Sequence, residues 1–231
     1  MANLRVFPSP EDMAVAFALK IKQLADDIVP VKGLPWRHKR IALSGGSTPQ
    51  RAYEFLAKED FDQSKIDWYM VDERYVPIED ERSNKAMIRR ALGDRFELNG
   101  MYQPGGMEDA ANAYNQLLRR DVDKFDLVVL GMGEDGHTAS IFPNRHPEVP
   151  LNEFCVASKA PVVCEDRITL TPRAICWARE TLFMVTGESK AKILREVLKG
   201  KLDTIRLPAQ YVHHHSINCH WWVDEQAASL L

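Results

Sequence analysis

The chain has 231 residues, of which 45% are hydrophobic and 27% are charged. This length and composition are typical of a globular protein, and we expect one α/β domain over residues 1–231. The formal net charge of −3 gives no electrostatic basis for binding nucleic acid or an anionic membrane surface. The apolar runs are too short to span a bilayer, and the N-terminus lacks the pattern of a signal peptide, so we expect a cytoplasmic protein.

The cysteines point to no metal or disulfide framework. Cys155, Cys164, Cys176 and Cys219 are scattered without CxxC spacing. In a chain without an export signal, we expect all four to be reduced thiols.

The first expected helix opens at Ser9 and Pro10, a capping serine followed by proline at the first helical position. Apolar residues recur at helical spacing from Ala14 to Ile28, which predicts one buried face. Short apolar runs then alternate with amphipathic segments. The expected strands are 40–46, 66–73, 125–133, 167–170, 181–187 and 219–225. The expected helices are 48–58, 83–92, 108–120, 135–142 and 188–199, followed by a helical tail.

Strands separated by helices predict a three-layer α/β fold, in which helices cover both faces of a mainly parallel, twisted sheet. Ligands of such sheets bind beyond the carboxyl ends of the strands. The polar residues that directly follow each apolar run are therefore the candidate site residues.

The first such junction is the glycine turn at residues 44–49. Gly45 and Gly46 let the backbone approach an anion, Ser47 and Thr48 offer hydroxyl donors, and a helix N-terminus follows. This pattern suits one phosphate group, although a simple capped turn remains the alternative. The lysine of a nucleotide-binding P-loop is missing.

The second junction places Asp72, Glu73 and Arg74 at the end of a buried strand. Charges in that position are costly unless they are paired or used. A structural salt bridge and a role in a site both remain open. Ser83 and Asn84 either hold down the intervening loop or cap the next helix.

The third junction, Gly131–Gly136, matches the G-x-G-x-x-G pattern of dinucleotide-binding proteins. Glu134 and Asp135 would repel a pyrophosphate, however, and the pattern comes past the middle of the chain. Asp135 is also two residues before His137, so that in a turn its carboxylate can orient the imidazole. We therefore favour a catalytic loop over a cofactor loop.

The fourth junction gathers cations, with Arg167 in one strand and Lys190 in the first turn of a helix. A lysine there opposes the helix dipole, which an anionic ligand would explain. Solvated surface charge is the alternative for either residue.

Two further patterns carry less weight. His213, His214 and His215 with Cys219 and His220 resemble metal ligands, but adjacent histidines in an extended segment point to opposite faces. We expect a surface loop there and no bound metal. Ser44 and Ser47 lack the G-x-S-x-G context, which argues against a serine hydrolase.

Taken together, these motifs resemble the 6-phosphogluconolactonase family. The matching segments are "LSGGSTP", "VDERYVP", "GMGEDGHTASIFP", "RITLTP", "VTGESKA" and "WWVDEQAA", which span roughly residues 40–228. Related glucosamine-6-phosphate isomerases share the glycine turn and a Gly-x-Asp-Gly-His loop. They differ where this chain has Arg74 and "TASIFP".

The resemblance implies a Rossmann-like sheet of the isomerase and CoA-transferase type, one small-molecule sugar-phosphate site, and no metal or nucleotide cofactor. It implies that the 6-phosphate is cradled by Gly45, Gly46, Ser47 and Thr48 and clamped by Arg167 and Lys190. Asp72 and Arg74 would lie beside the sugar, with Asp135 and His137 at the carbonyl. Monomer and homodimer both stay open.

Three other functions are weighed against the lactonase. An isomerase or deaminase of amino sugar phosphates would use Asp72 as the proton-abstracting base. A sugar-phosphate sensor would keep the pocket without catalysis. A dehydrogenase would use the glycine pattern for a nucleotide.

Overall fold

The computed structural model describes residues 3–27, 37–145, 152–161 and 165–231. Two residues named above, Ile28 and Cys164, lie outside these ranges. Cys155, Cys176 and Cys219 are free thiols, as expected.

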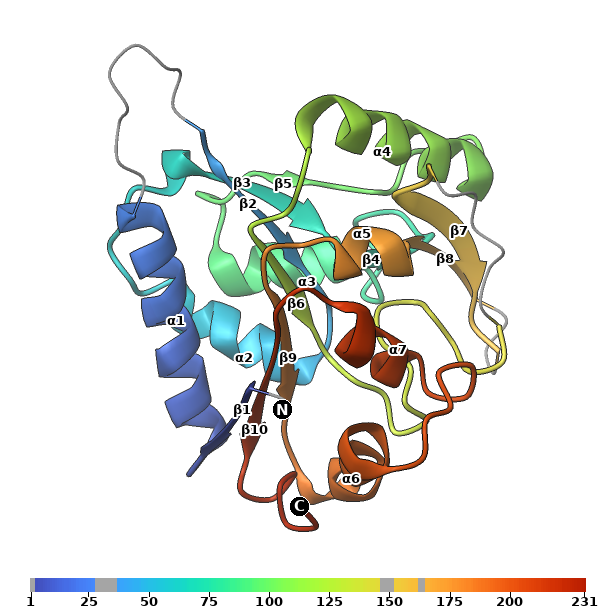
Figure 1. The fold of residues 1–231 in the computed structure, drawn as a ribbon. Helices are drawn as coiled ribbons and strands as arrows, with labels where there is room; N and C mark the ends of the chain where they lie inside the picture. Colours follow the sequence, from blue (N-terminus) through green and yellow to red (C-terminus); the bar gives the residue numbers. More distant parts are fainter. Residues whose placement is uncertain (1–2, 28–36, 146–151, 162–164) are drawn as a thin grey trace.

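A seven-stranded sheet forms the centre of the molecule (Figure 1). Every pairing within it is parallel, and the strand order is β1-β10-β9-β6-β2-β3-β5. The middle strands β6 and β9 are buried along their whole length, as expected for strands covered on both faces. The strands are β1 (Asn3–Phe7), β2 (Lys39–Leu43), β3 (Ile66–Met70), β5 (Leu98–Asn99), β6 (Leu127–Leu130), β9 (Thr181–Val185) and β10 (Cys219–Asp224).

Helices cover both faces of this sheet, which confirms the predicted three-layer α/β class. In Figure 1, α1 and α2 lie to the left of the sheet, and α4, α5, α6 and α7 lie to the right. The helices are α1 (Pro10–Asp26), α2 (Ser47–Leu56), α3 (Asn84–Leu92), α4 (Met107–Asp121), α5 (Pro172–Cys176), α6 (Ala191–Lys199) and α7 (Pro208–His215), with 3₁₀ turns η1 (Gln63–Lys65) and η2 (Glu188–Lys190). None of the described helices is long and apolar enough to cross a membrane.

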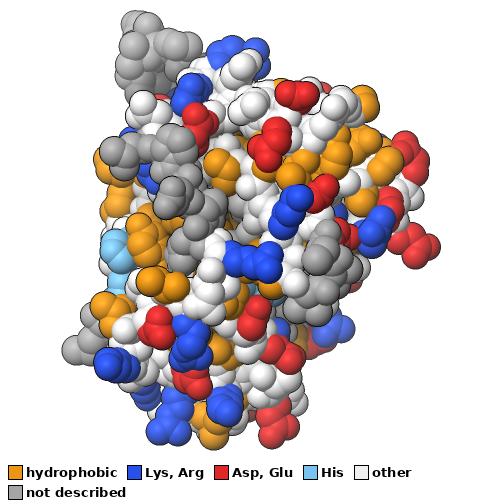
Figure 2. Space-filling view, turned by 90° about the vertical axis from the view of Figure 1, so that its right-hand side faces the viewer, with side chains coloured by type: hydrophobic (Ala, Val, Ile, Leu, Met, Phe, Trp, Pro, Cys, Tyr) orange, Lys and Arg blue, Asp and Glu red, His pale blue; other side chains and the backbone are white. Residues whose placement is uncertain are grey.

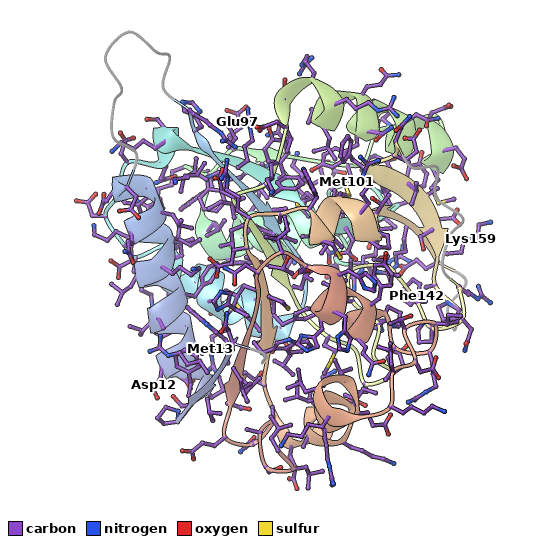
Figure 3. All side chains as sticks on the ribbon, in the orientation of Figure 1. Asp12, Met13, Glu97, Met101, Phe142 and Lys159 are labelled. Carbon is purple, nitrogen blue, oxygen red and sulfur yellow. The ribbon has the colours of Figure 1, made fainter. Side chains whose placement is uncertain are left out.

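The first helix shows how the sequence pattern becomes packing. Ser9 caps α1 by accepting from the backbone N–H of Asp12 at 3.1 Å, and Pro10 follows at the first helical position. Met13, Phe17 and Ile21 are each at most 1% exposed. Figure 3 shows Met13 on the sheet side of this helix and Asp12 on the outer side.

A second, antiparallel sheet lies beside the first, with the order β4-β8-β7. Its strands are β4 (Asp72–Arg74), β8 (Asp166–Leu170) and β7 (Cys155–Lys159). The single strand expected at 66–73 is therefore divided. Val71 makes the junction, because its N–H donates to Leu43 of the main sheet at 2.9 Å and its carbonyl accepts from Leu170 of the small sheet at 2.8 Å.

The order in which the chain builds the main sheet creates a switch point. From β2 the chain adds β3 and β5 on one side, and it then returns to add β6, β9 and β10 on the other. Successive connections diverge at β2 and β6, and a crevice forms at the carboxyl ends of such strands. This is where a ligand site is expected.

Three further expectations about local structure are wrong. Residues 135–142 form turns rather than a short helix, and 225–230 form turns rather than a helical tail. Positive φ at Ala139, 51°, interrupts any helix in the first segment. The expected surface loop at His213–His215 is the last turn of α7, and the edge strand β1 was not anticipated.

The surface mixes both signs of charge. Figure 2 shows one face, on which Lys and Arg side chains are interspersed with Asp and Glu. Several exposed side chains form ion pairs, such as Arg82 with Asp80 at 2.6 Å. Pairs of this kind contribute little to stability.

Candidate active site

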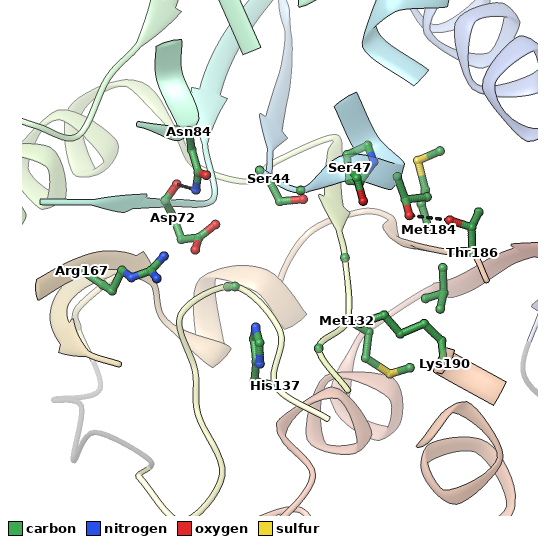
Figure 4. Close-up of a pocket in the computed structure, with 18 of the residues that line it drawn as sticks. Ser44, Ser47, Asp72, Asn84, Met132, His137, Arg167, Met184, Thr186 and Lys190 are labelled. Atoms are coloured by element: carbon green, nitrogen blue, oxygen red, sulfur yellow. Dashed lines mark hydrogen bonds between the residues drawn. The ribbon is translucent and has the colours of Figure 1, made fainter. Parts of the chain in front are cut away.

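A pocket of about 350 Å³ opens at the switch point (Figure 4). Its walls come from the segments that follow β2, β3, β6 and β9, together with β4 and β8. All the predicted site residues line it except Asp135, which contacts His137. The predicted residues that line the pocket are Gly45, Gly46, Ser47, Thr48, Asp72, Arg74, His137, Arg167 and Lys190.

The glycine turn after β2 forms one wall of the pocket. Gly46 precedes α2 with φ of 105°, a conformation that favours glycine, and no side chain caps this helix. The first N–H groups of a helix have no partner within it, so those of Ser47 and Thr48 can donate hydrogen bonds to an anion. A Cβ on residue 45 would overlap the side chain of Asn84, which explains why this position is also a glycine.

Lys190 approaches the same end of the pocket from the other side of the switch point. It ends the turn η2, and its backbone N–H donates to the Gly187 carbonyl at 3.1 Å. The Oγ1 atoms of Thr186 and Thr48 lie 2.6 Å apart, which ties this segment to the glycine turn. The lysine and the helix N-terminus therefore face the same end of the pocket.

Two arginines face the opposite end. Arg74 of β4 and Arg167 of β8 are directly paired across the small sheet. Arg74 donates through Nη1 to the carbonyl of Arg82 at 2.6 Å, and Arg167 forms an ion pair with Glu165 at 2.6 Å. The Nε atoms of both arginines are buried without a hydrogen-bond partner. Burial and then the charge of Arg74 lower the pKa of Arg167.

The two predicted phosphate-clamping cations are thus separated. Figure 4 draws Arg167 on one side beside Asp72 and Lys190 on the other, with His137 between them. Both cations nevertheless line the same pocket, which therefore has positive charge at each end.

His137 and Asp135 form a close pair in the loop after β6. The ring Nδ1 of His137 lies 2.6 Å from Oδ1 of Asp135, and the same oxygen accepts the His137 backbone N–H at 3.0 Å. Burial raises the pKa of Asp135, but the hydrogen bonds from His137 outweigh it, so the pKa of this carboxyl falls below its usual value. The ring therefore faces an ionised partner at neutral pH.

The glycines of this loop serve the His–Asp pair. A Cβ on Gly133 would overlap the His137 ring, and Gly136 adopts φ of 83°. The Gly133 N–H donates to the His137 carbonyl at 2.9 Å, which closes the turn. Turns follow Gly136, whereas a dinucleotide fingerprint requires a helix N-terminus there.

Polar residues in and behind the pocket wall were not predicted as site residues. Ser140 donates through Oγ to Asp72 Oδ2 at 2.7 Å, and Asn84 donates through Nδ2 to the Asp72 carbonyl at 3.0 Å. Ser83 accepts the N–H of Ala86 at 3.1 Å and so caps α3. The "SN" pair thus both caps the helix and holds the loop. The sequence signal that could have identified Ser140 is its place in "TASIFP", directly after the His137 loop.

The histidines near the C-terminus have structural partners. His213 accepts from the indole N–H of Trp221 at 3.2 Å, and the ring of His215 stacks on Tyr211. Burial lowers the pKa of His213. Among the described residues, no group of three His, Cys, Asp or Glu side chains is placed to hold a metal ion.

Fold and site together define a class. The chain is an α/β protein of doubly wound topology, with an acid–base pair between two cationic ends of a pocket at the switch point. Such a pocket suits a small anionic ligand.

The chain belongs to the family described as glucosamine-6-phosphate isomerases/6-phosphogluconolactonase, whose family model matches residues 8–221. It is 37% identical over 181 residues to a 6-phosphogluconolactonase of Thermotoga maritima, covering 74% of this chain and 78% of that protein. It is 32% identical to a 6-phosphogluconolactonase of Bos taurus, covering 99% of this chain and 93% of the relative.

A solved structure supports the same placement. The crystal structure of a 6-phosphogluconolactonase from Shewanella baltica superposes with a TM-score of 0.87 at 27% identity, covering 97% of this chain and 98% of that one. The family and the fold class predicted from the sequence are both confirmed.

Proposed function

We propose that this protein hydrolyses 6-phospho-D-glucono-1,5-lactone to 6-phospho-D-gluconate, the lactonase step of the oxidative pentose phosphate pathway. The names of its relatives support the reaction. The observation that carries the proposal is the His137–Asp135 pair, set between two cationic ends of one pocket.

In the proposed complex, the glycine turn and Lys190 hold the phosphate. Gly45 and Gly46 allow close approach, Ser47 and Thr48 donate from the start of α2, and Lys190 supplies the positive charge. Because Arg167 lies opposite Arg74 and away from Lys190, we assign it to the sugar end rather than to the phosphate.

The proposed chemistry uses the ring nitrogen that Asp135 leaves free. Nδ1 of His137 faces Asp135, so Nε2 takes a proton from a water molecule as that water attacks C1. The tetrahedral intermediate collapses with cleavage of the bond between C1 and the ring oxygen. The imidazolium returns its proton to that oxygen, and the products are the open-chain hydroxyl and a carboxyl group, which ionises at neutral pH.

The remaining residues stabilise charge and orient the substrate. Arg74 would stabilise the oxyanion on the carbonyl oxygen, because the N–H groups of Gly133, Gly136 and His137 already donate within the loop. Losing one such donor costs about 10²–10³ in turnover. Asp72, held by Ser140, would lie beside the sugar hydroxyls. Binding of the phosphate fixes C1 near the histidine. The described mechanism requires no metal and no nucleotide.

The decisive assay follows 6-phosphogluconate formation from freshly generated lactone, with the spontaneous rate subtracted. We expect the protein to accelerate this reaction. The absence of acceleration by folded protein, together with ammonia release from glucosamine 6-phosphate, would replace the lactonase by a deaminase in which Asp72 is the base. Binding of either sugar phosphate without turnover would indicate a sensor.

A further inference from the structure

Two deeply buried carboxylates lie outside the pocket lining. Glu73 is 1% exposed and Asp224 is 2% exposed. Within the described part of the chain, neither forms a salt bridge, and each instead accepts hydrogen bonds from backbone N–H groups. A buried carboxylate is costly unless such donors compensate it, so both positions need a physical explanation.

Glu73 is the middle residue of β4, so its side chain points away from Asp72 and Arg74 on either side. Its carboxylate accepts the N–H groups of Asn84 at 2.6 Å, of Lys85 at 2.8 Å and of Arg74 at 2.8 Å. The Ser83 hydroxyl donates to it at 3.1 Å. The carboxylate thus binds the positive end of α3 and ties this helix to β4.

This attachment sets the sugar end of the pocket. Asn84 begins α3, donates to the Asp72 carbonyl at 3.0 Å and packs against Gly45 of the glycine turn. Asp72 and Arg74 flank Glu73 in the strand. A shift of α3 relative to β4 would therefore move three pocket side chains together.

Asp224 makes an equivalent attachment at the phosphate end. It ends β10, and both of its carboxylate oxygens lie within reach of the Gly187 N–H, at 3.0 and 3.1 Å. Oδ1 also accepts the N–H of Ala227 at 2.8 Å. Gly187 opens the turn that ends at Lys190, and the neighbouring Thr186 contacts Thr48.

We propose that Glu73 and Asp224 are positioning residues, one for each end of the pocket: Glu73 aligns Asp72, Arg74 and Asn84, and Asp224 aligns Thr186 and Lys190. The assignment of ends rests on the proposed function. Neither carboxylate touches the ligand. Each acts by fixing backbone that carries ligand-facing side chains, and a displacement of about 1 Å can cost about 10² in rate.

The test compares Glu73→Gln with Asp224→Asn in the full chain. Thermal unfolding first identifies a temperature at which both variants are folded. Lactonase kinetics and calorimetric titration with inorganic phosphate and with 6-phosphogluconate follow at that temperature. Ser9→Ala is the matched control, because it removes the side chain that caps α1 at a place far from the pocket. It shows how the loss of a helix cap affects stability without a change in the pocket.

The two variants should fail in different ways. For Glu73→Gln we expect kcat to fall about 10-fold to 100-fold, with the Kd of inorganic phosphate within about twofold of wild type. For Asp224→Asn we expect the Kd of inorganic phosphate and the KM to rise about tenfold or more, with a smaller change in kcat. Ser9→Ala should lower Tm and leave kcat and the phosphate Kd unchanged.

The proposal is overturned if the folded variants keep the wild-type kcat and phosphate Kd. It is also overturned if both variants change kcat and the phosphate Kd to the same extent. If either variant does not fold, Ser83→Ala weakens the Glu73 attachment and Gly187→Ala strains the segment that Asp224 holds, with the same expected division. If wild type binds phosphate but does not hydrolyse the lactone, the proposed function fails, while the phosphate and 6-phosphogluconate affinities still test both positions.

Discussion

A single oxygen of Asp135 contacts both the backbone and the ring of His137. Oδ1 accepts the backbone N–H at 3.0 Å and lies 2.6 Å from Nδ1. The backbone contact fixes the carboxylate, and the ring contact fixes which nitrogen faces the pocket. This turn of three residues thereby orients the ring of the proposed general base, and the Gly133 N–H closes the loop on the His137 carbonyl at 2.9 Å.

Replacing His137 by alanine should abolish most of the catalysis. General acid–base help contributes roughly 10²–10⁴-fold, so we expect kcat to fall by about that factor. Affinity for 6-phosphogluconate should change little, because the phosphate contacts remain. His38→Ala is the matched control, since His38 forms a similar pair with Asp67 at 2.9 Å on the surface. Full activity in His137→Ala would move the base to another residue, with Asp72 next.

Adding a single methyl group to the loop should have a similar effect. In Gly133→Ala the new Cβ overlaps the His137 ring, so the ring must rotate away from Asp135. We expect kcat to fall at least about tenfold, while calorimetry shows an unchanged Kd for inorganic phosphate. Wild-type turnover in a folded Gly133→Ala variant would show that the observed ring position is not the catalytic one.

The two cations at opposite ends can be assigned by a comparison of variants. Lys190→Ala should raise the Kd of inorganic phosphate and the KM about tenfold or more, because the lysine faces the helix N-terminus. Arg167→Ala should leave the phosphate Kd unchanged and weaken 6-phosphogluconate binding. If Arg167→Ala instead raises the Kd of inorganic phosphate and Lys190→Ala does not, the phosphate lies between Arg74 and Arg167. The substrate would then bind in the orientation opposite to the one proposed.

Glu73 should make stability depend on pH. Burial raises the pKa of Glu73 above its usual range, and the backbone N–H groups only partly offset this. The folded state therefore holds the Glu73 proton more tightly than the unfolded state. The protonated carboxyl makes its full contribution to the free energy of unfolding when the pH is below the pKa that Glu73 has in the unfolded chain. This contribution is lost as the pH rises through the pKa that Glu73 has in the folded state.

Urea unfolding of wild type and Glu73→Gln from pH 4 to pH 7 checks this linkage. The free energy of unfolding of wild type minus that of the variant should decline as the pH rises, because glutamine does not titrate. A difference that is constant across this range would contradict the raised pKa.

Much of the fold was predictable because it follows from local pattern. The apolar runs at β6 and β9 are too continuous for a strand exposed on one face, and Ser9 with Pro10 specifies a helix start. Elements without such signals were missed. Four of the five residues of β1 are exposed, and Leu207, which precedes α7, provides no side-chain cap.

Local pattern also misled where tertiary contacts compete with it. A short helix was expected at 135–142, but Thr138 donates to the Gly131 carbonyl at 2.8 Å and Ala139 takes a positive φ. The strand expected at 66–73 is divided at Val71 because its neighbours on the two sides belong to different sheets.

The sequence by itself determined the α/β class, the family and the residue types of the pocket. Parallel strands end at a common edge, so polar residues that follow separate strands converge whatever the details of packing. Only the tertiary structure placed Arg167 opposite Arg74 and away from Lys190, and only it linked Glu73 to α3 and Asp224 to Gly187. These relationships depend on strand order and on hydrogen bonds between distant segments, which no local periodicity encodes.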